Sequence, residues 1–292
     1  MKQTASYKCF GGEVRTYTHA AETTRCAMTF SVYLPPAASE AGRARPPVIY
    51  YLSGLTCTDQ NALTKAGLQA HAAARNVALV FPDTSPRGYS PAIENDSTSW
   101  DFGLGASFYV RATTERWRDH YNMYDYVVSE LPALLERELP DALDHKRRSI
   151  MGHSMGGHGA LVCALKNPGR YVSVSAFAPV CNPVNCPWGV KAFTGYLGAD
   201  TSAWRAWDAC ELVRAYAGPP VSVLVDQGTA DSFLAQKQLL PDALVEAAKH
   251  SKLVSLHLRF QGGYDHSYYF MLTFGRDHVD FHADALERAA RL

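Results

Sequence analysis

The sequence predicts an α/β protein in which a mostly parallel central sheet carries helices on both faces. Five short runs are apolar at nearly every position, which is typical of strands that helices cover on both sides. Stretches with helical periodicity separate these runs, and an alternation of strand and helix patterns indicates a parallel sheet. The five runs lie at residues 48–52, 77–81, 149–151 with its flanks, 172–178 and 221–225.

One further strand is expected before these runs and another after them. Residues 28–34 and 253–260 each alternate between apolar and polar or smaller side chains. The proline-rich stretch 35–47 is expected to form a surface loop. The stretch 82–117 is rich in aromatic residues, glycine and serine but shows little periodicity, and such long irregular segments are uncommon unless they serve a function.

Helical patterns fill the spaces between strands, and a last helix closes the chain. Pro132 interrupts the second pattern and is expected to kink that helix. The third pattern ends at Asn167, where a proline and a glycine follow as stop signals. The last helix has an apolar stripe that includes Leu272 and Leu286 and is expected to pack on the sheet. The inner patterns cover residues 63–75, 124–139, 155–167 and 239–250.

Charge and composition exclude several classes of protein. The 292 residues include 28 Lys and Arg against 28 Asp and Glu, whereas a protein that coats nucleic acid needs a basic excess. No stretch approaches the roughly 20 apolar residues that span a bilayer, and residues 1–10 lack the apolar core of a secretory signal. The seven cysteines are scattered and complete no zinc pattern, so we expect a cytoplasmic protein with reduced thiols and no metal.

The strongest chemical signal is Gly-His-Ser-Met-Gly at residues 152–156. It matches the G-x-S-x-G nucleophile elbow, in which a tight turn between strand and helix raises a serine above the sheet edge. An apolar strand pattern precedes the motif and a helical pattern follows it, as the elbow requires. Ser154 is therefore the candidate nucleophile, and the alternative is a chance match to a short motif.

A serine hydroxyl needs a base to become a nucleophile, and in this arrangement the base follows the serine in the chain. His257 falls in a predicted strand, and His278 and His282 fall in the last helix, where we expect surface or packing groups. His266 lies in a loop between a strand and the last helix, so it is the candidate base. The alternative is a loop histidine that bonds only its neighbours.

Two aspartates compete for the role of the acid that orients this histidine. Asp226 directly follows the apolar run 221–225, and Asp231 lies five residues further on, in the loop before the next helix. Asp265 adjoins His266, and adjacent side chains rarely reach triad geometry. The residue pattern by itself does not choose between Asp226 and Asp231.

Acyl transfer also needs N–H donors for the oxyanion. One is expected from the residue after the nucleophile, Met155, and the other from a loop that follows an earlier strand. Gly54 allows the chain to turn just after the run 48–52, which makes the N–H of Leu55 the candidate for the second donor. An ordinary glycine loop is the alternative.

Six blocks of sequence occur in one characteristic order: SGLTCT at 53–58, DTSPRG at 83–88, WDFG at 100–103, GHSMGGHGA at 152–160, CPWG at 186–189 and GYDHSYYF at 263–270. Together they resemble the S-formylglutathione hydrolase family, also called esterase D, from about residue 7 to the last helix. The resemblance implies a single α/β-hydrolase domain over residues 1–292 and a possible homodimer. It implies cleavage of S-formylglutathione to formate and glutathione, with side activity on short activated esters and without a cofactor.

Position by position, the resemblance implies that Ser154 is the nucleophile and His266 the base. It favours Asp231 over the alternative aspartate, because the family's acid begins a D-x-F-L segment and this chain has that segment at residues 231–234. It places the two oxyanion donors at Leu55 and Met155.

The resemblance also bears on the residues around the site. Cys57 matches a thiol that lies near the family's active site without being the nucleophile. Because formyl is the smallest acyl group, the acyl pocket should be tight. Its candidate wall residues are Trp100, Phe102 and Trp188, for which plain core packing is the alternative.

The glutathione part of the substrate carries two carboxylates, so cations are expected to hold it. Arg87 and Lys191 are the candidates, and a solvated surface charge is the alternative for each. Two other functions compete with the thioesterase: a broad carboxylesterase with the same triad, and a non-catalytic relative that serves as a binding module. All three triad candidates are present, which counts against the non-catalytic alternative.

Overall fold

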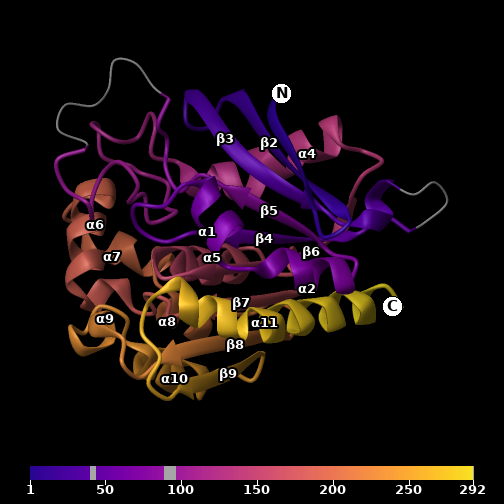
Figure 1. The fold of residues 1–292 in the computed structure, drawn as a ribbon. Helices are drawn as coiled ribbons and strands as arrows, with labels where there is room; N and C mark the ends of the chain where they lie inside the picture. Colours follow the sequence, from indigo (N-terminus) through magenta and orange to yellow (C-terminus); the bar gives the residue numbers. More distant parts are fainter. Residues whose placement is uncertain (40–43, 89–96, 292) are drawn as a thin grey trace.

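Nine strands form one sheet in the computed structural model, which describes residues 1–39, 44–88 and 97–291 (Figure 1). The order across the sheet is β1-β2-β3-β5-β4-β6-β7-β8-β9. From β5 to β9 every neighbouring pair is parallel, and β1, β2 and β3 add an antiparallel extension beside β5. The strands are β1 (Lys2–Cys9), β2 (Gly12–Ala21), β3 (Cys26–Leu34), β4 (Pro47–Leu52), β5 (Ala78–Pro82), β6 (Asp144–His153), β7 (Ser173–Phe177), β8 (Val221–Gly228) and β9 (Val254–Gln261).

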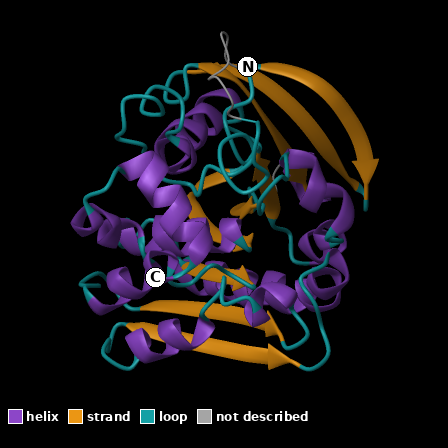
Figure 2. Ribbon diagram, turned by 90° about the vertical axis from the view of Figure 1, so that its left-hand side faces the viewer, coloured by secondary structure: helices purple, strands orange, loops and turns teal. Residues whose placement is uncertain are grey.

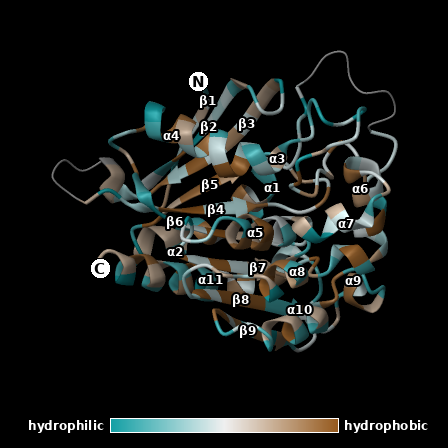
Figure 3. Cartoon of the chain, turned by 180° about the vertical axis from the view of Figure 1, so that it is seen from behind, coloured by the Kyte–Doolittle hydropathy of each residue, from teal (hydrophilic) through white to brown (hydrophobic). Residues whose placement is uncertain are grey.

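Helices cover both faces of this sheet (Figure 2). On one face, α1 and α2 pack with the long C-terminal helix α11; on the other, α5 lies against the central strands and α8 and α10 pack outside it. Figure 3 shows hydrophobic residues along α5, whose residues 155–165 are all buried. The helices are α1 (Asp59–Lys65), α2 (Leu68–Ala74), α3 (Met123–Asp125), α4 (Leu131–Glu138), α5 (Met155–Lys166), α6 (Pro187–Leu197), α7 (Thr201–Trp204), α8 (Ala209–Arg214), α9 (Ser232–Ala235), α10 (Pro241–Ala248) and α11 (Tyr268–Ala289).

The predicted α/β class, with its mostly parallel sheet and helices on both faces, is confirmed. Each apolar run and both alternating segments became strands. The prediction missed β1 and β2. Nearly every residue of β1 is exposed, so this strand has no hydrophobic pattern, whereas β2 has a partly buried pattern that the prediction did not include. No helix in the described ranges is long and apolar enough to cross a membrane.

Two predicted helices are interrupted. The pattern 63–75 is split between α1 and α2 at Gly67, whose φ of +65° suits glycine and where a Cβ would collide with Leu272 of α11. The pattern 124–139 contains α3, a π-helical turn at Tyr126–Glu130, and α4. Pro132 lies in the first turn of α4, where a missing N–H costs little. The interruption expected at this proline is therefore a change of helix type just before it.

Parallel strands end at one edge of the sheet, and this edge gathers the candidate residues. In the β4–β6 pair Leu52 lies opposite Gly152, so the segments that follow these two strands start side by side. In the β8–β9 pair Gly228 lies opposite Gln261, so the segments that carry Asp231 and His266 also start side by side. Apart from Pro82, which ends β5, the loop stretch 82–117 holds no named helix or strand in its described part, and residues 89–96 lie outside the described ranges, as do residues 40–43 of the stretch 35–47.

Candidate active site

A cavity of about 210 Å³ opens where these strands end. Ser154 and His266 both line it, so the structure brings the candidate nucleophile and the candidate base to one space. It is smaller than the ~300–1,000 Å³ typical of pockets for drug-sized ligands, and therefore suits a small reacting group. Its lining residues in the described part of the chain are Gly54, Leu55, Thr56, Cys57, Trp100, His153, Ser154, Trp188, Phe233, His266 and Tyr268.

Ser154 occupies the sharp turn between β6 and α5. Its φ of 58° and ψ of −121° are rare for a residue with a side chain, so the surrounding structure must hold it there. The Ser154 N–H donates to the carbonyl of Phe177 at 2.9 Å, and the Ser154 carbonyl accepts from the N–H of His158 at 3.0 Å. A Cβ at Gly152 or Gly156 would collide with backbone, which explains both glycines of the motif.

His266 is oriented by Asp231. The Nδ1 atom of the ring lies 2.6 Å from Oδ2 of Asp231, which also accepts from Gln227, while Oδ1 accepts from the N–H of Phe233. Burial opposes ionisation of Asp231, but the hydrogen bond and charge of His266, together with the hydrogen bonds from Phe233 and Gln227, outweigh it and lower the pKa of this carboxyl. With Nδ1 bonded to Asp231, Nε2 is the ring nitrogen available to a group in the cavity.

The alternative acid, Asp226, belongs to a different buried cluster. Its carboxylate binds both Nε and Nη2 of Arg259 at 2.6 Å and lies 3.1 Å from Nε2 of His278. Burial again opposes ionisation, but these partners lower the pKa of Asp226 to about 2. The tie between the two aspartates is therefore resolved spatially: Asp231 contacts His266, and Asp226 faces helix α11.

The same cluster decides between the two alternatives predicted for the helix histidines, surface or packing groups, in favour of packing. His278 and His282 are fully buried between α11 and the sheet. Nδ1 of His278 and Nε2 of His282 both hydrogen-bond the Ser175 hydroxyl, and Nδ1 of His282 bonds the Ser173 hydroxyl. Burial lowers the pKa of both histidines, so they act as neutral packing groups.

Residues 54–57 form a tight turn beside Ser154, in which the N–H of Cys57 bonds the carbonyl of Gly54 at 3.3 Å. A Cβ on Gly54 would lie 3.1 Å from Cβ of Ser154, so glycine lets the turn approach the serine closely. Leu55 lines the cavity, and none of the described residues accepts a hydrogen bond from its N–H. Met155 begins α5, where first-turn N–H groups have no partner within the helix.

Aromatic rings line the cavity, and they include two of the three that were predicted. Trp188 and Trp100 line it and meet edge to face, with ring centroids 5.6 Å apart. Phe102 is absent from the described lining, because its ring stacks on Tyr196 at 4.7 Å within a separate aromatic cluster. Phe233, which the sequence did not single out, takes part instead and packs edge-on against His266.

The two expected cations do not line the described cavity either. Arg87 is paired with Asp83, and Lys191 is paired with Asp101. Both charges are thus engaged within the protein, and the expectation that one of them holds a substrate carboxylate is not supported.

Three further groups border the catalytic candidates. Cys57 lines the cavity as expected, with its Sγ 3.5 Å from the Tyr268 hydroxyl at the start of α11. His153 packs against the His266 ring with centroids 4.4 Å apart, and burial lowers the pKa of His153 well below its usual value. His153 and Tyr268 were not predicted, although both lie in blocks that the resemblance used.

Comparison with known proteins extends over almost the whole chain. The profile of a family described as putative esterases matches residues 21–288. S-formylglutathione hydrolases of Rattus norvegicus and Bos taurus are 52% and 53% identical over 286 residues, covering 98% of this chain and 99% of theirs. The solved structure of an S-formylglutathione hydrolase from Agrobacterium tumefaciens superimposes with a TM-score of 0.92 at 46% identity, covering 98% of this chain and 100% of that one.

Proposed function

Because the chain belongs to the S-formylglutathione hydrolase family of esterases, we propose that it cleaves the thioester S-formylglutathione to formate and glutathione. The observation that carries this proposal is the joint placement of Ser154 and His266 in one small cavity, with His266 bonded through Nδ1 to buried Asp231. These are the three groups that a serine hydrolase needs.

In the first half-reaction His266 acts as the base. Its Nε2 takes the Ser154 hydroxyl proton while Oγ bonds to the formyl carbon, and Asp231 stabilises the imidazolium that forms. The carbon–sulfur bond then breaks, and glutathione leaves as a thiolate that takes up the proton. A thiolate is a good leaving group, so this step needs little acid assistance.

In the second half-reaction water replaces the thiol. His266 removes a proton from the water as its oxygen attacks the formyl-Ser154 ester, and the Ser154 oxygen leaves with the proton that the imidazolium returns. Formate is released and the serine hydroxyl is restored. No cofactor takes part in this sequence of steps.

The N–H groups of Leu55 and Met155 stabilise the tetrahedral intermediates of both halves. One lies in the tight turn beside Ser154 and the other at the start of α5, where the helix dipole also favours negative charge. The walls formed by Trp188 and Phe233 leave room for a small acyl group. We place the active enzyme in the cytoplasm, as a single domain and a homodimer.

The deciding experiment compares two substrates. The wild-type enzyme should show a kcat/KM for S-formylglutathione at least about 10-fold above that for a short aryl ester such as an acetate. The compact cavity favours the one-carbon acyl group, and thiolate is the better leaving group. A reversed ranking would identify a general carboxylesterase, and turnover of neither would identify a non-catalytic relative.

Cys57→Ala should retain activity within about threefold, because the proposed chemistry runs through Ser154. Alkylation of Cys57 should nevertheless inactivate the wild type, since the thiol lines the cavity and the added group would occupy it. Burial raises the pKa of Cys57, so less thiolate is present at neutral pH and iodoacetamide should inactivate faster as the pH rises. The measurement is the inactivation rate at two pH values, with Cys57→Ala as the resistant control. Loss of turnover in Cys57→Ala would give this thiol a chemical role.

A further inference from the structure

The turn at residues 54–57 is held in an unfavourable backbone conformation. Thr56 has a φ of +65°, a value that a β-branched residue rarely adopts. Such conformations cost free energy and persist only where surrounding contacts over-determine them. If Leu55 of this turn donates to the oxyanion, those contacts control a catalytic distance.

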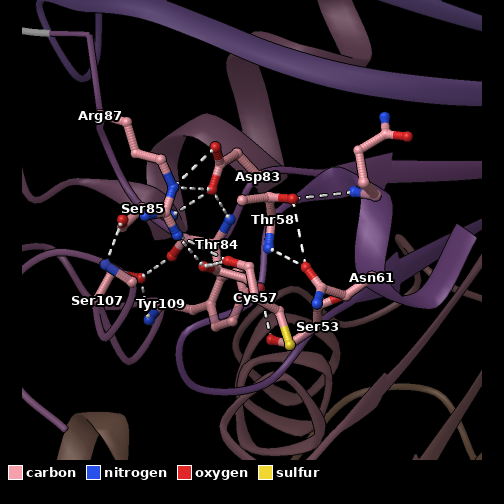
Figure 4. Close-up of polar contacts among 12 residues, drawn as sticks. Ser53, Cys57, Thr58, Asn61, Asp83, Thr84, Ser85, Arg87, Ser107 and Tyr109 are labelled. Atoms are coloured by element: carbon pink, nitrogen blue, oxygen red, sulfur yellow. Dashed lines mark hydrogen bonds and ion pairs between the residues drawn. The ribbon is translucent and has the colours of Figure 1, made fainter. Parts of the chain in front are cut away.

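Two groups of contacts hold the turn, and Figure 4 shows the second of them, around Cys57, Thr84 and Arg87. In the first, the N–H of Thr56 donates to the carbonyl of Gly105 at 2.9 Å, which fixes the orientation of the peptide between Leu55 and Thr56. In the second, the Cys57 carbonyl accepts from Nη2 of Arg87 at 2.8 Å and from the Thr84 hydroxyl. The end of the turn is therefore held by a guanidinium and a hydroxyl.

Arg87 is itself rigidly anchored. Its Nε lies 2.9 and 3.1 Å from the two carboxylate oxygens of Asp83, a buried residue that directly follows β5. The N–H of Asp83 donates to the carbonyl of Thr29 at 3.0 Å, which ties the pair to the sheet. A Cβ on Gly105 would lie 3.2 Å from Nη2 of Arg87, so the neighbouring loop also closes around the guanidinium. Arg87 thus connects the sheet to the turn.

We propose that Arg87 is a positioning residue for the reaction: through the Cys57 carbonyl it fixes the 54–57 turn so that the Leu55 N–H points at the oxyanion. This inference rests on the proposed function. Arg87 does not line the described cavity, so it acts through the turn and does not touch the substrate. The planar fork of arginine is what allows one side chain to bind a carboxylate and a carbonyl in different directions, and lysine lacks this fork.

The test measures kcat and KM for S-formylglutathione in Arg87→Gln and Arg87→Lys, each normalised by end-point titration of the active serine. We expect Arg87→Gln to lower kcat about 10- to 100-fold with KM changed less than about threefold, since outright loss of an oxyanion donor costs about 10²–10³ in kcat. Arg87→Lys should be impaired nearly as much. Arg111→Gln is the matched control, because Arg111 forms a similar forked pair with Asp125 outside the described cavity lining.

A second measurement reports on the oxyanion directly. A trifluoromethyl ketone analogue adds to Ser154 and places its oxygen where the oxyanion forms, so its Ki should rise by the same factor as kcat/KM falls. A loss of folded protein alone would lower the titrated fraction and leave this Ki unchanged. If Arg87→Gln does not fold, Thr84→Val removes the second donor to the Cys57 carbonyl and should lower kcat about three- to tenfold.

Several outcomes would overturn the inference. Full activity per titrated site in Arg87→Gln would show that the turn keeps its geometry without the guanidinium. Recovery to within about twofold in Arg87→Lys would show that the charge matters and the fork does not. A failure of the proposed function is distinguishable, because in that case the wild type itself would not turn over S-formylglutathione.

Discussion

Ser154→Ala should abolish hydrolysis of S-formylglutathione, with kcat lowered by about 10⁶-fold, as happens when a serine hydrolase loses its nucleophile. The alanine removes the oxygen that bonds to the acyl carbon, and none of the hydrogen bonds within the described residues joins another cavity hydroxyl, that of Thr56 or Tyr268, to His266. Steady-state assays with high enzyme concentration measure the residual rate.

The fold should survive this substitution. The strained backbone at Ser154 is held by main-chain hydrogen bonds to Phe177 and His158, which alanine keeps. Thermal unfolding should therefore be nearly unchanged, and a fluorophosphonate probe should label the wild type but not the variant. Ser222→Ala, at an exposed position of β8, is the matched control and should retain full activity and labelling. Turnover by Ser154→Ala above about 1% of wild type would contradict the proposed nucleophile.

Asp231→Asn should lower kcat about 10⁴-fold, because an asparagine at this position favours the wrong tautomer of the histidine and stabilises no imidazolium. In the structure Asp231 is buried and its Oδ2 lies 2.6 Å from Nδ1 of His266. Kinetics at saturating substrate measure the effect on the chemical step, and an unchanged melting temperature would show that the loss is chemical.

Asp226→Asn is the informative comparison, since this aspartate lies on β8, five residues before Asp231, and is equally buried but serves a different cluster. We expect kcat per folded molecule within a few-fold of wild type and a loss of about 2 kcal/mol in unfolding free energy, less than for a fully buried pair because Arg259 is partly exposed. If Asp226→Asn proved the more damaging to kcat, the roles of the two aspartates would be reversed.

The contribution of Asp226 to the free energy of unfolding should also depend on pH. The pKa of Asp226 falls from its usual 3.8 to about 2 on folding. A lowered pKa means that the ionised group stabilises the folded state above about pH 4, and that this contribution is lost as the pH falls toward 2. The stability difference between wild type and Asp226→Asn should therefore shrink over this range, which acid titrations of the unfolding free energy measure.

Much of the parallel sheet was predictable because buried strands are apolar on both faces, as in residues 48–52 of β4. Of the antiparallel extension only β3 was predicted, from the alternation at residues 28–34, whereas β1 is exposed at most positions and makes no hydrophobic pattern. Helix interruptions were predictable only in part. Pro132 was visible in the sequence, and so was Gly67, but that this glycine adopts a left-handed conformation and ends one helix before the next begins was seen only in the structure.

The candidate site, like the fold, was predictable from the sequence only in part. The sequence by itself determined the local chemistry: the strand–turn–helix around Ser154, the loop position of His266 and the glycine that precedes Leu55. These depend on neighbours in the chain, so short motifs are sufficient to predict them. The prediction of a small acyl pocket near Cys57 and Trp188 came from the resemblance to the family.

Only the tertiary structure decided which charged groups meet. Asp226 and Asp231 lie five residues apart, yet one pairs with Arg259 beneath α11 and the other with His266 at the cavity. Arg87 was a candidate for binding the substrate, with a solvated surface charge as the alternative, and it binds Asp83 and the Cys57 carbonyl. The physical reason is that a buried charge takes whatever partner the packing of distant segments brings within hydrogen-bond distance, and that choice is made across the sheet and not along the chain.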